Sequence, residues 1–306
     1  MQRGRARFVA RGARRLGTTG TAAAAGIVAV VAASHAATLR LVEVERFDLP
    51  YPAYVEPVAV AAGPLGQVFI ADGGRGTVLR VGDQGSVEYE FEFPPQQSGL
   101  QPLDLDVTGF QVFVLDAVSK ALLRFSHEGA YLDVLQSFVE GNRGLPGAVS
   151  VDATGRVLVT DPSRHVVRLV DETQKIESVI GGFGTRPGEL SRPGGVAFTS
   201  QGAFYVADTG NRRVQRFDEV GNYVSTPVDS LREPRGIATG GAGLVFVADA
   251  GGAVHALTTR AEDGGQHVIL ELPGVQPIDV TAQGEHLWVL SRQPRALLRV
   301  RVVWGE

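Results

Sequence analysis

Three acidic residues stand in or just before short apolar segments. Glu56 precedes PVAVAA, Asp104 lies within PLDLDVT, and Asp279 lies within PIDVT. Carboxylate oxygens are the ligands that hard cations such as Ca²⁺ take, and Zn²⁺ also accepts them. A cation held by such groups could activate a water molecule or polarise a carbonyl. If the fold brings them together, Glu56, Asp104 and Asp279 form a candidate metal site.

Motifs of other enzyme classes are missing from the sequence. The chain has no cysteine, which excludes thiolate metal sites and cysteine nucleophiles. None of its six histidines stands four residues from another, as a zinc-binding helix requires. Neither a G-x-S-x-G turn nor a phosphate-binding loop occurs. We therefore assign no catalytic residue, and no cofactor beyond the Ca or Zn ion that the acidic set would hold.

A second set of candidate residues is basic and falls in Gly- and Pro-rich turns. Its members, which we expect on one face, are Arg75, Lys120, Arg164, Arg192, Arg212, Arg235, Arg292 and Arg295. Guanidinium groups pair well with the carboxylate or phosphate groups of a partner. The alternative is a solvated charged rim that Glu56 and Glu233 balance. No aromatic residues are interleaved for base stacking, which argues against a nucleic-acid partner.

Both sets are positioned by one repeat that fills the chain. Six short strands end at intervals of 41 to 47 residues, at Asp72, Asp116, Asp161, Asp208, Asp249 and Ser291. A proline stands 14 or 15 residues before each of these ends, and an alternating strand follows each. An aspartate at the end of a strand commonly caps the next turn through backbone N–H groups. We expect the five aspartates to do this rather than to form a site.

A period near 45 residues with three or four strands per unit is typical of a β-propeller blade. Fourth, outer strands are expected at 87–93, 131–138, 175–180, 223–228 and 267–272. The sixth unit ends without one, and the alternating segment 39–47 can supply it. The sequence therefore predicts an all-β, six-bladed propeller in which an N-terminal strand completes the last blade and closes the ring.

The fourth unit resembles the NHL repeat. It has a Gly-rich lead from Gly182 to Leu190, the strand Pro193-Gly194-Gly195-Val196-Ala197, and the turn Val206-Ala207-Asp208-Thr209-Gly210-Asn211 followed by Arg212-Arg213-Val214. The resemblance implies a six-bladed propeller but no single activity. Its family includes RNA- and protein-binding modules, extracytoplasmic sensor domains and some lyases. Related propellers include metal-dependent lactonases, whose site would need Asn as well as acids, and this chain has no Asn at the matching positions.

Residues 1–36 differ from the rest of the chain. Six arginines precede an Ala/Gly/Val-rich stretch and the sequence Ser34-His35-Ala36, which is the pattern of a cleaved secretory signal peptide. An uncleaved membrane anchor is the alternative. Without these arginines, the remaining basic residues face 33 acidic ones with a net charge of about −10, which disfavours nucleic acid. Residues 37–306 then form one propeller domain, located outside the cytoplasm as a periplasmic or secreted protein.

The expected function is that of an exported, non-catalytic module that binds a protein, peptide or glycan of the cell envelope. The ring would supply a rigid platform and the loops the specificity. No stable membrane span is expected. The alternative is a metal-dependent lactonase or lyase with a cation at the mouth of the central channel.

Overall fold

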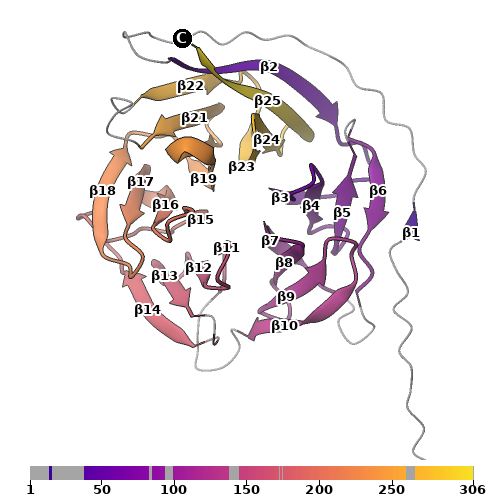
Figure 1. The fold of residues 1–306 in the computed structure, drawn as a ribbon, viewed down its shortest axis with the longest axis horizontal. Coiled ribbons are helices and arrows are strands. Elements are labelled where there is room, and N and C mark those ends of the chain that lie inside the picture. Colours follow the sequence, from indigo (N-terminus) through magenta and orange to yellow (C-terminus); the bar gives the residue numbers. More distant parts are fainter. Residues whose placement is uncertain are drawn as a thin grey trace, which may run out of the picture.

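The computed structural model describes residues 14–15, 38–82, 85–93, 99–137, 145–171, 173, 175–259 and 266–305. Six antiparallel sheets stand around a central axis like the blades of a propeller (Figure 1). Each blade runs from an inner strand beside the axis to an outer strand at the rim. The predicted fold class, an all-β six-bladed propeller, is confirmed.

The blades follow the chain in order. Blade one contains β3 (Pro57–Ala62), β4 (Val68–Asp72), β5 (Thr77–Val81) and β6 (Val87–Glu90), with the short β1 (Arg14–Arg15) paired to β6. Blade two contains β7 (Pro102–Thr108), β8 (Gln111–Asp116), β9 (Ala121–Ser126) and β10 (Tyr131–Ser137). Blade three contains β11 (Val149–Val151), β12 (Val157–Asp161), β13 (Val166–Val170) and β14 (Ile176–Gly181).

The second half of the ring repeats the pattern. Blade four contains β15 (Val196–Phe198), β16 (Phe204–Asp208), β17 (Arg213–Phe217) and β18 (Tyr223–Val228), with a 3-10 turn at Thr209–Asn211. Blade five contains β19 (Pro234–Thr239), β20 (Leu244–Asp249), β21 (Ala253–Thr258) and β22 (His267–Glu271), with a 3-10 turn at Gly241–Gly243. Blade six contains β23 (Pro277–Gln283), β24 (His286–Ser291), β25 (Ala296–Gly305) and β2 (Thr38–Asp48).

The ring is closed by the N-terminal strand. β2 pairs antiparallel with β25 from Thr38 opposite Gly305 to Asp48 opposite Ala296 (Figure 1). Strands from both ends of the chain therefore share the last blade, as the alternating segment 39–47 predicted. This pairing removes the open sheet edge that an incomplete sixth blade would present to solvent.

The apolar core lies between neighbouring blades. Six clusters of buried side chains each join residues of two adjacent blades. The second strand of a blade has both faces covered, so β4, β12, β16 and β20 are buried along their whole length. This explains why these strands read as continuous apolar runs in the sequence rather than as alternating ones.

The aspartates that end the second strands are structural, as expected. Asp72 is fully buried and accepts hydrogen bonds from the backbone N–H groups of Val55, Glu56 and Arg75. Asp249 does the same for Arg232, Glu233 and Gly251. Each carboxylate thus ties the turn after its strand to the loop that leads into the inner strand of the same blade.

Most of the predicted signal peptide, residues 1–36, lies outside the described residues. Within the part of the chain that the structure describes, no helix is long and apolar enough to span a membrane.

Candidate functional site

The inner strands of the six blades enclose a cavity of about 1310 Å³ along the axis of the ring. Its walls come from all six inner strands, and the loops at both ends of these strands form its two mouths. Apolar residues alternate on these strands with residues that face the channel. The polar groups that line this channel are the candidate site.

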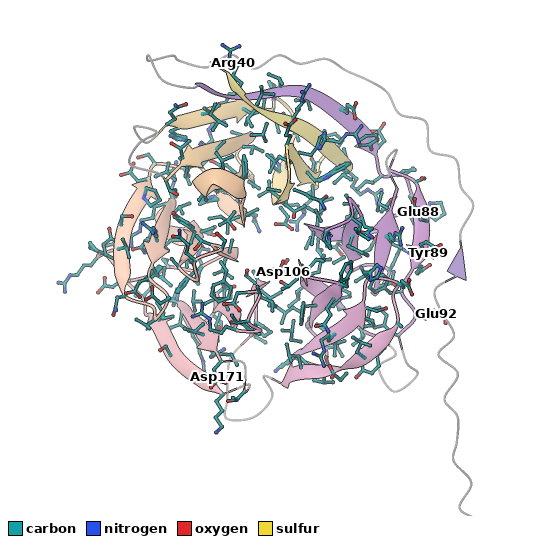
Figure 2. All side chains as sticks on the ribbon, in the orientation of Figure 1. Arg40, Glu88, Tyr89, Glu92, Asp106 and Asp171 are labelled. Atoms are coloured by element: carbon teal, nitrogen blue, oxygen red, sulfur yellow. The ribbon has the colours of Figure 1, made fainter. Side chains whose placement is uncertain are left out.

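Three aspartates face the channel from two inner strands. Asp104 and Asp106 are two residues apart on β7, so the alternation of a strand points them to the same side. Asp279 occupies on β23 the position that Asp104 occupies on β7, two residues after the first proline of the strand. Figure 2 shows Asp106 beside the central opening. All three side chains keep partial access to the channel.

Each of these carboxylates also fastens its blade to the next one around the ring. One oxygen of each accepts a 2.7 Å hydrogen bond from an inner-strand N–H group of the following blade: Val149 for Asp104, Val151 for Asp106 and Val60 for Asp279. These contacts fix where the carboxyl groups lie. A second lone pair on each oxygen remains available for a ligand.

The surroundings favour the protonated form of all three acids. Burial raises the pKa of Asp106 to about 6, against bonds from backbone N–H groups that oppose the shift. Burial, with the charge of Asp106 as a smaller cause, raises the pKa of Asp279 to about 7. Burial and then the charge of Asp279 raise the pKa of Asp104 well above its usual value. Near neutral pH the cluster therefore holds both protonated and ionised carboxyl groups.

The predicted metal site does not assemble as proposed. Asp104 and Asp279 both line the channel, from the inner strands of blades two and six, but Glu56 is exposed and lies outside the channel lining. Its loop is held by Asp72, which binds the Glu56 N–H group at 2.9 Å. Among the described residues, no group of three or more histidines and carboxylates is placed to hold a metal ion. The channel acids therefore do not fit a cation site.

The eight predicted binding-face residues divide into two groups. Arg192, Arg212, Arg235 and Arg292 line one mouth of the channel. Arg232, which the sequence reasoning did not include, joins them there. The rest lie outside the channel lining, namely Arg75, Lys120, Arg164 and Arg295.

Two of the outlying arginines have structural partners. Arg75 pairs with Glu90 at 2.8 Å and also donates to the carbonyl of Pro52. Arg295 donates to the carbonyl groups of Tyr54 and Val55. Both side chains thereby hold the segment that connects β2 to β3.

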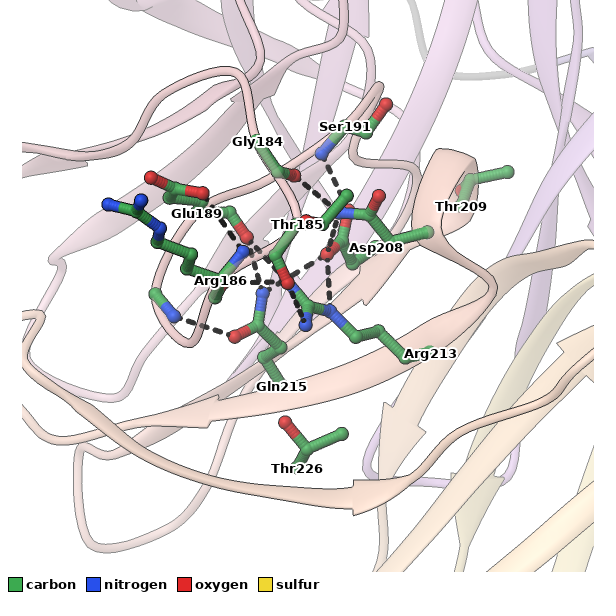
Figure 3. Close-up of polar contacts among 12 residues, drawn as sticks. Gly184, Thr185, Arg186, Glu189, Ser191, Asp208, Thr209, Arg213, Gln215 and Thr226 are labelled. Atoms are coloured by element: carbon green, nitrogen blue, oxygen red, sulfur yellow. Dashed lines mark hydrogen bonds and ion pairs between the residues drawn. The ribbon is translucent and has the colours of Figure 1, made fainter.

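The loop that leads into β15 is held by a buried polar network around Asp208 (Figure 3). The Asp208 carboxylate accepts bonds from the Ser191 N–H group at 2.7 Å and from the guanidinium of Arg213 at 2.8 Å. Arg213 in turn donates to the carbonyl groups of Thr185 and Glu189. The network fixes the residue before Arg192, and so fixes where Arg192 meets the mouth.

Comparison with known proteins agrees with the fold. Residues 190–217 match the NHL repeat family, and together with the six blades this confirms the resemblance to NHL-repeat propellers. No curated protein matches the chain.

Similar solved structures include a gluconolactonase from Xanthomonas campestris, with a TM-score of 0.69, 16% identity, and coverage of 95% of this chain and 100% of that one. A virginiamycin B lyase from Staphylococcus aureus has a TM-score of 0.59 and 13% identity, covering 87% of this chain and 100% of that one. A streptogramin B lyase also has a TM-score of 0.59 and 13% identity, covering 85% of this chain and 97% of that one.

These neighbours correct the expected function. The chain was interpreted as a non-catalytic binding module, yet the propellers named above are enzymes. The error came from the missing sequence motifs, because a cluster of channel carboxyl groups leaves no local signature. At these identities the likeness establishes the fold, so an activity has to be argued from the channel itself.

Proposed function

We propose that this NHL-repeat propeller is an enzyme that opens lactones, or closely related cyclic esters, inside its central channel. The observation that carries the proposal is that Asp104, Asp106 and Asp279 line one channel, where burial raises the pKa of Asp106 to about 6, that of Asp279 to about 7 and that of Asp104 well above its usual value. Acids and bases that act at neutral pH need pKa values in this range. The likeness to a gluconolactonase over 95% of the chain supports the choice of substrate class.

The three carboxyl groups divide naturally into a base and an acid. Asp106 has the lower pKa, about 6, so it is ionised at pH 7 and can accept a proton from water. Burial raises the pKa of both Asp104 and Asp279, and the charge of Asp279 raises that of Asp104 further, so we assign the proton that is retained at the same pH to these two residues. Acid–base catalysis requires one group that is ionised and one that is protonated at the same pH, and neighbouring groups with different pKa values meet this requirement.

In the proposed reaction, water attacks the carbonyl carbon of the lactone while Asp106 takes one of its protons. A carbon–oxygen bond forms to the water oxygen, and the bond between the carbonyl carbon and the ring oxygen breaks. The Asp104–Asp279 pair gives its proton to the departing ring oxygen. The product is a hydroxy acid, and transfer of the proton from Asp106 back to the pair restores the enzyme.

The same groups suit a second reaction class. A lyase would use Asp106 to remove a proton from carbon and the Asp104–Asp279 pair to protonate the leaving oxygen, with no water consumed. The likeness to virginiamycin B lyase favours keeping this candidate. Product analysis separates the two reactions, because hydrolysis adds one water to the mass and elimination does not.

The proposed chemistry takes no step through a metal ion, because the donor set in the channel does not fit one. We therefore expect dialysis against a chelator to leave turnover unchanged. A loss of activity that Ca²⁺ or Zn²⁺ restores would contradict this part of the proposal.

The experiment that tests the function is an assay of purified protein against a panel of γ- and δ-lactones, with product masses recorded. Asp106→Asn and Asp279→Asn should each lower kcat/KM by about a hundredfold or more, since general acid–base catalysis contributes roughly 10² to 10⁴. Asp171→Asn is the matched control, because Asp171 lies at the outer edge of the ring (Figure 2). Activity retained in both channel variants would refute the assignment.

Export remains part of the proposal. The arginine-rich, alanine-rich residues 1–36 support a signal peptide, which places the enzyme in the periplasm or outside the cell. Sequencing of the mature N-terminus tests this, and a mature protein that begins at Met1 would contradict it.

A further inference from the structure

One mouth of the channel carries five arginines from three consecutive blades, the fourth to the sixth. We propose that this arginine mouth, defined as Arg192, Arg212, Arg232, Arg235 and Arg292, binds an anionic group of the substrate, a carboxylate or a phosphate. That the bound anion belongs to a substrate rests on the proposed function, whereas the anion site itself follows from charge and geometry alone.

The arginine mouth is not neutralised by the protein. Glu233 is the one acidic residue among the described residues that line this mouth, and it pairs with Arg235. Across the described chain, Arg192, Arg212, Arg232 and Arg292 have no carboxylate partner.

Several arginines elsewhere in the ring do have such partners. Arg124 pairs with Asp133, and Arg168 pairs with Asp161 at 2.9 Å in a buried contact. At the opposite mouth of the channel, Arg156 pairs with Asp152 at 2.8 Å. Within the described chain, arginines without a carboxylate partner also occur outside the channel, as at Arg164 and Arg295, but the arginine mouth gathers four of them around one opening of a protein whose remaining charge is strongly negative.

Several of these arginines are held in place by backbone groups. Nε of Arg212 donates to the carbonyl of Leu231 at 2.7 Å, and a terminal nitrogen of Arg232 donates to the carbonyl of Gly251 at 2.7 Å. Each guanidinium has five N–H donors in a fixed fork, so most of them stay free for a ligand. A guanidinium group that is held in place but still has free N–H donors is well suited to bind an oxyanion through bidentate hydrogen bonds.

The position of Arg192 is maintained against a conformational preference. Its φ of +46° lies in the left-handed region that residues with a side chain seldom adopt. A hydrogen bond of 2.9 Å from its N–H group to Nδ1 of His165 holds it there. The conformation is compatible with a functional position, since such strain persists only where surrounding contacts fix it.

Charge along the channel then orients the ligand. The acids Asp104, Asp106 and Asp279 lie on the inner strands, whereas the arginines lie on the loops at the mouth or, for Arg235, at the start of the inner strand β19. A negatively charged group is attracted by the mouth and repelled by ionised carboxylates inside. The substrate class that fits is a lactone whose ring enters the channel while a carboxylate or phosphate at its other end stays among the arginines.

The test is calorimetric titration of the full mature protein at low ionic strength with stable, ring-opened probes. We expect 6-phosphogluconate and gluconate to bind and neutral sorbitol not to bind. The anion with the lower Kd shows whether phosphate or carboxylate is preferred. Arg192→Gln combined with Arg292→Gln should raise the Kd about a hundredfold, since a hydrogen bond to a charged group contributes about tenfold. Raising the salt concentration should weaken binding as well.

Arg164→Gln is the matched control, because Arg164 is an exposed arginine that lies outside the channel lining. Its Kd should equal that of the wild type. Equal binding of sorbitol and the anions, or no anion binding at all, would overturn the proposal. The two claims can fail separately. Anion binding by a wild-type protein that turns over no lactone would leave the anion site standing and refute the lactonase.

Discussion

Replacing Asp279 with asparagine should stabilise the protein at high pH although it removes a buried hydrogen-bonding side chain. Burial raises the pKa of Asp279 from 3.8 to about 7 in the folded state. The folded protein therefore keeps a proton at pH values where the unfolded chain has released it. The stability that this proton confers is complete below about pH 4 and is lost as the pH rises through about 7.

The size of the effect follows from that pKa difference. A difference of about 3 corresponds to about 4 kcal/mol of unfolding free energy at 1.36 kcal/mol per pH unit. The carboxyl keeps some contact with the channel, so solvent reduces the effect, and we expect about 2 kcal/mol. Asparagine cannot ionise, and its carbonyl can still accept the Val60 N–H bond that measures 2.7 Å in the wild type.

The assay is chemical denaturation of wild type and Asp279→Asn at intervals between pH 5 and pH 8. The variant should gain about 2 kcal/mol relative to wild type over this range, with its free energy of unfolding higher at pH 8. Asp171→Asn is the control: hydrogen bonds from Lys175 and Thr173 lower the pKa of Asp171, so it has no titration in this window. A stability difference that stays flat from pH 5 to pH 8 would refute the reasoning.

Three further substitutions test the contacts that hold the ring and the channel in shape. Asp208→Asn should cost about 3 kcal/mol, because it leaves the Arg213 guanidinium without its 2.8 Å carboxylate partner, and thermal unfolding checks this against exposed Asp229→Asn. Leu41→Ala should cost about 3 kcal/mol because the side chain is fully buried in the closing strand β2, whereas exposed Arg40→Ala should cost little; denaturant titration decides. Gly236→Ala should abolish lactone turnover and lower the melting temperature, since the new Cβ would lie 2.2 Å from Oδ1 and 2.5 Å from the backbone Cα of Asp279; Gly241→Ala, with open space around it, should be silent.

The architecture could be predicted because every blade repeats the same two landmarks. A proline starts the inner strand or stands three residues before it, and an Asp or Ser ends the second strand, in each of the six units from Asp72 to Ser291. The closing strand was also predictable, since 39–47 alternates and belonged to no other blade. The outer strands were right in place, and 223–228 matches β18 in full, but the first was expected to reach residue 93 and ends at Glu90.

The channel site could be predicted only in part. Asp104 and Asp279 could be predicted because they lie in the segments expected to form inner strands, which line the channel. Glu56 was wrongly grouped with them, because nothing local shows that the Asp72 carboxylate holds its backbone in an exposed loop. Which residues meet across a ring depends on the angle between blades, and the sequence of one blade does not contain it.

The arginine mouth shows the same limit. Most of the predicted basic residues lie in turns after second strands, and of those at the entry to inner strands only Arg192 and Arg235 were included, so Arg232 was missed. Its signal was present: Arg192 and Arg232 both stand within two residues of the proline that starts or precedes the inner strand. The raised pKa values of the channel acids had no signal at all, because burial by other blades causes them.

The pH dependence of kcat/KM for a δ-lactone tests the central claim most directly, measured in a pH-stat against a protein-free blank. If Asp106 is the base and the Asp104–Asp279 pair is the acid, the wild-type profile should rise through about pH 6 and fall at a pH of about 7 or above. Asp106→Asn should remove nearly all turnover at every pH. A flat wild-type profile between pH 5 and pH 8, or an unchanged profile in Asp106→Asn, would contradict the account.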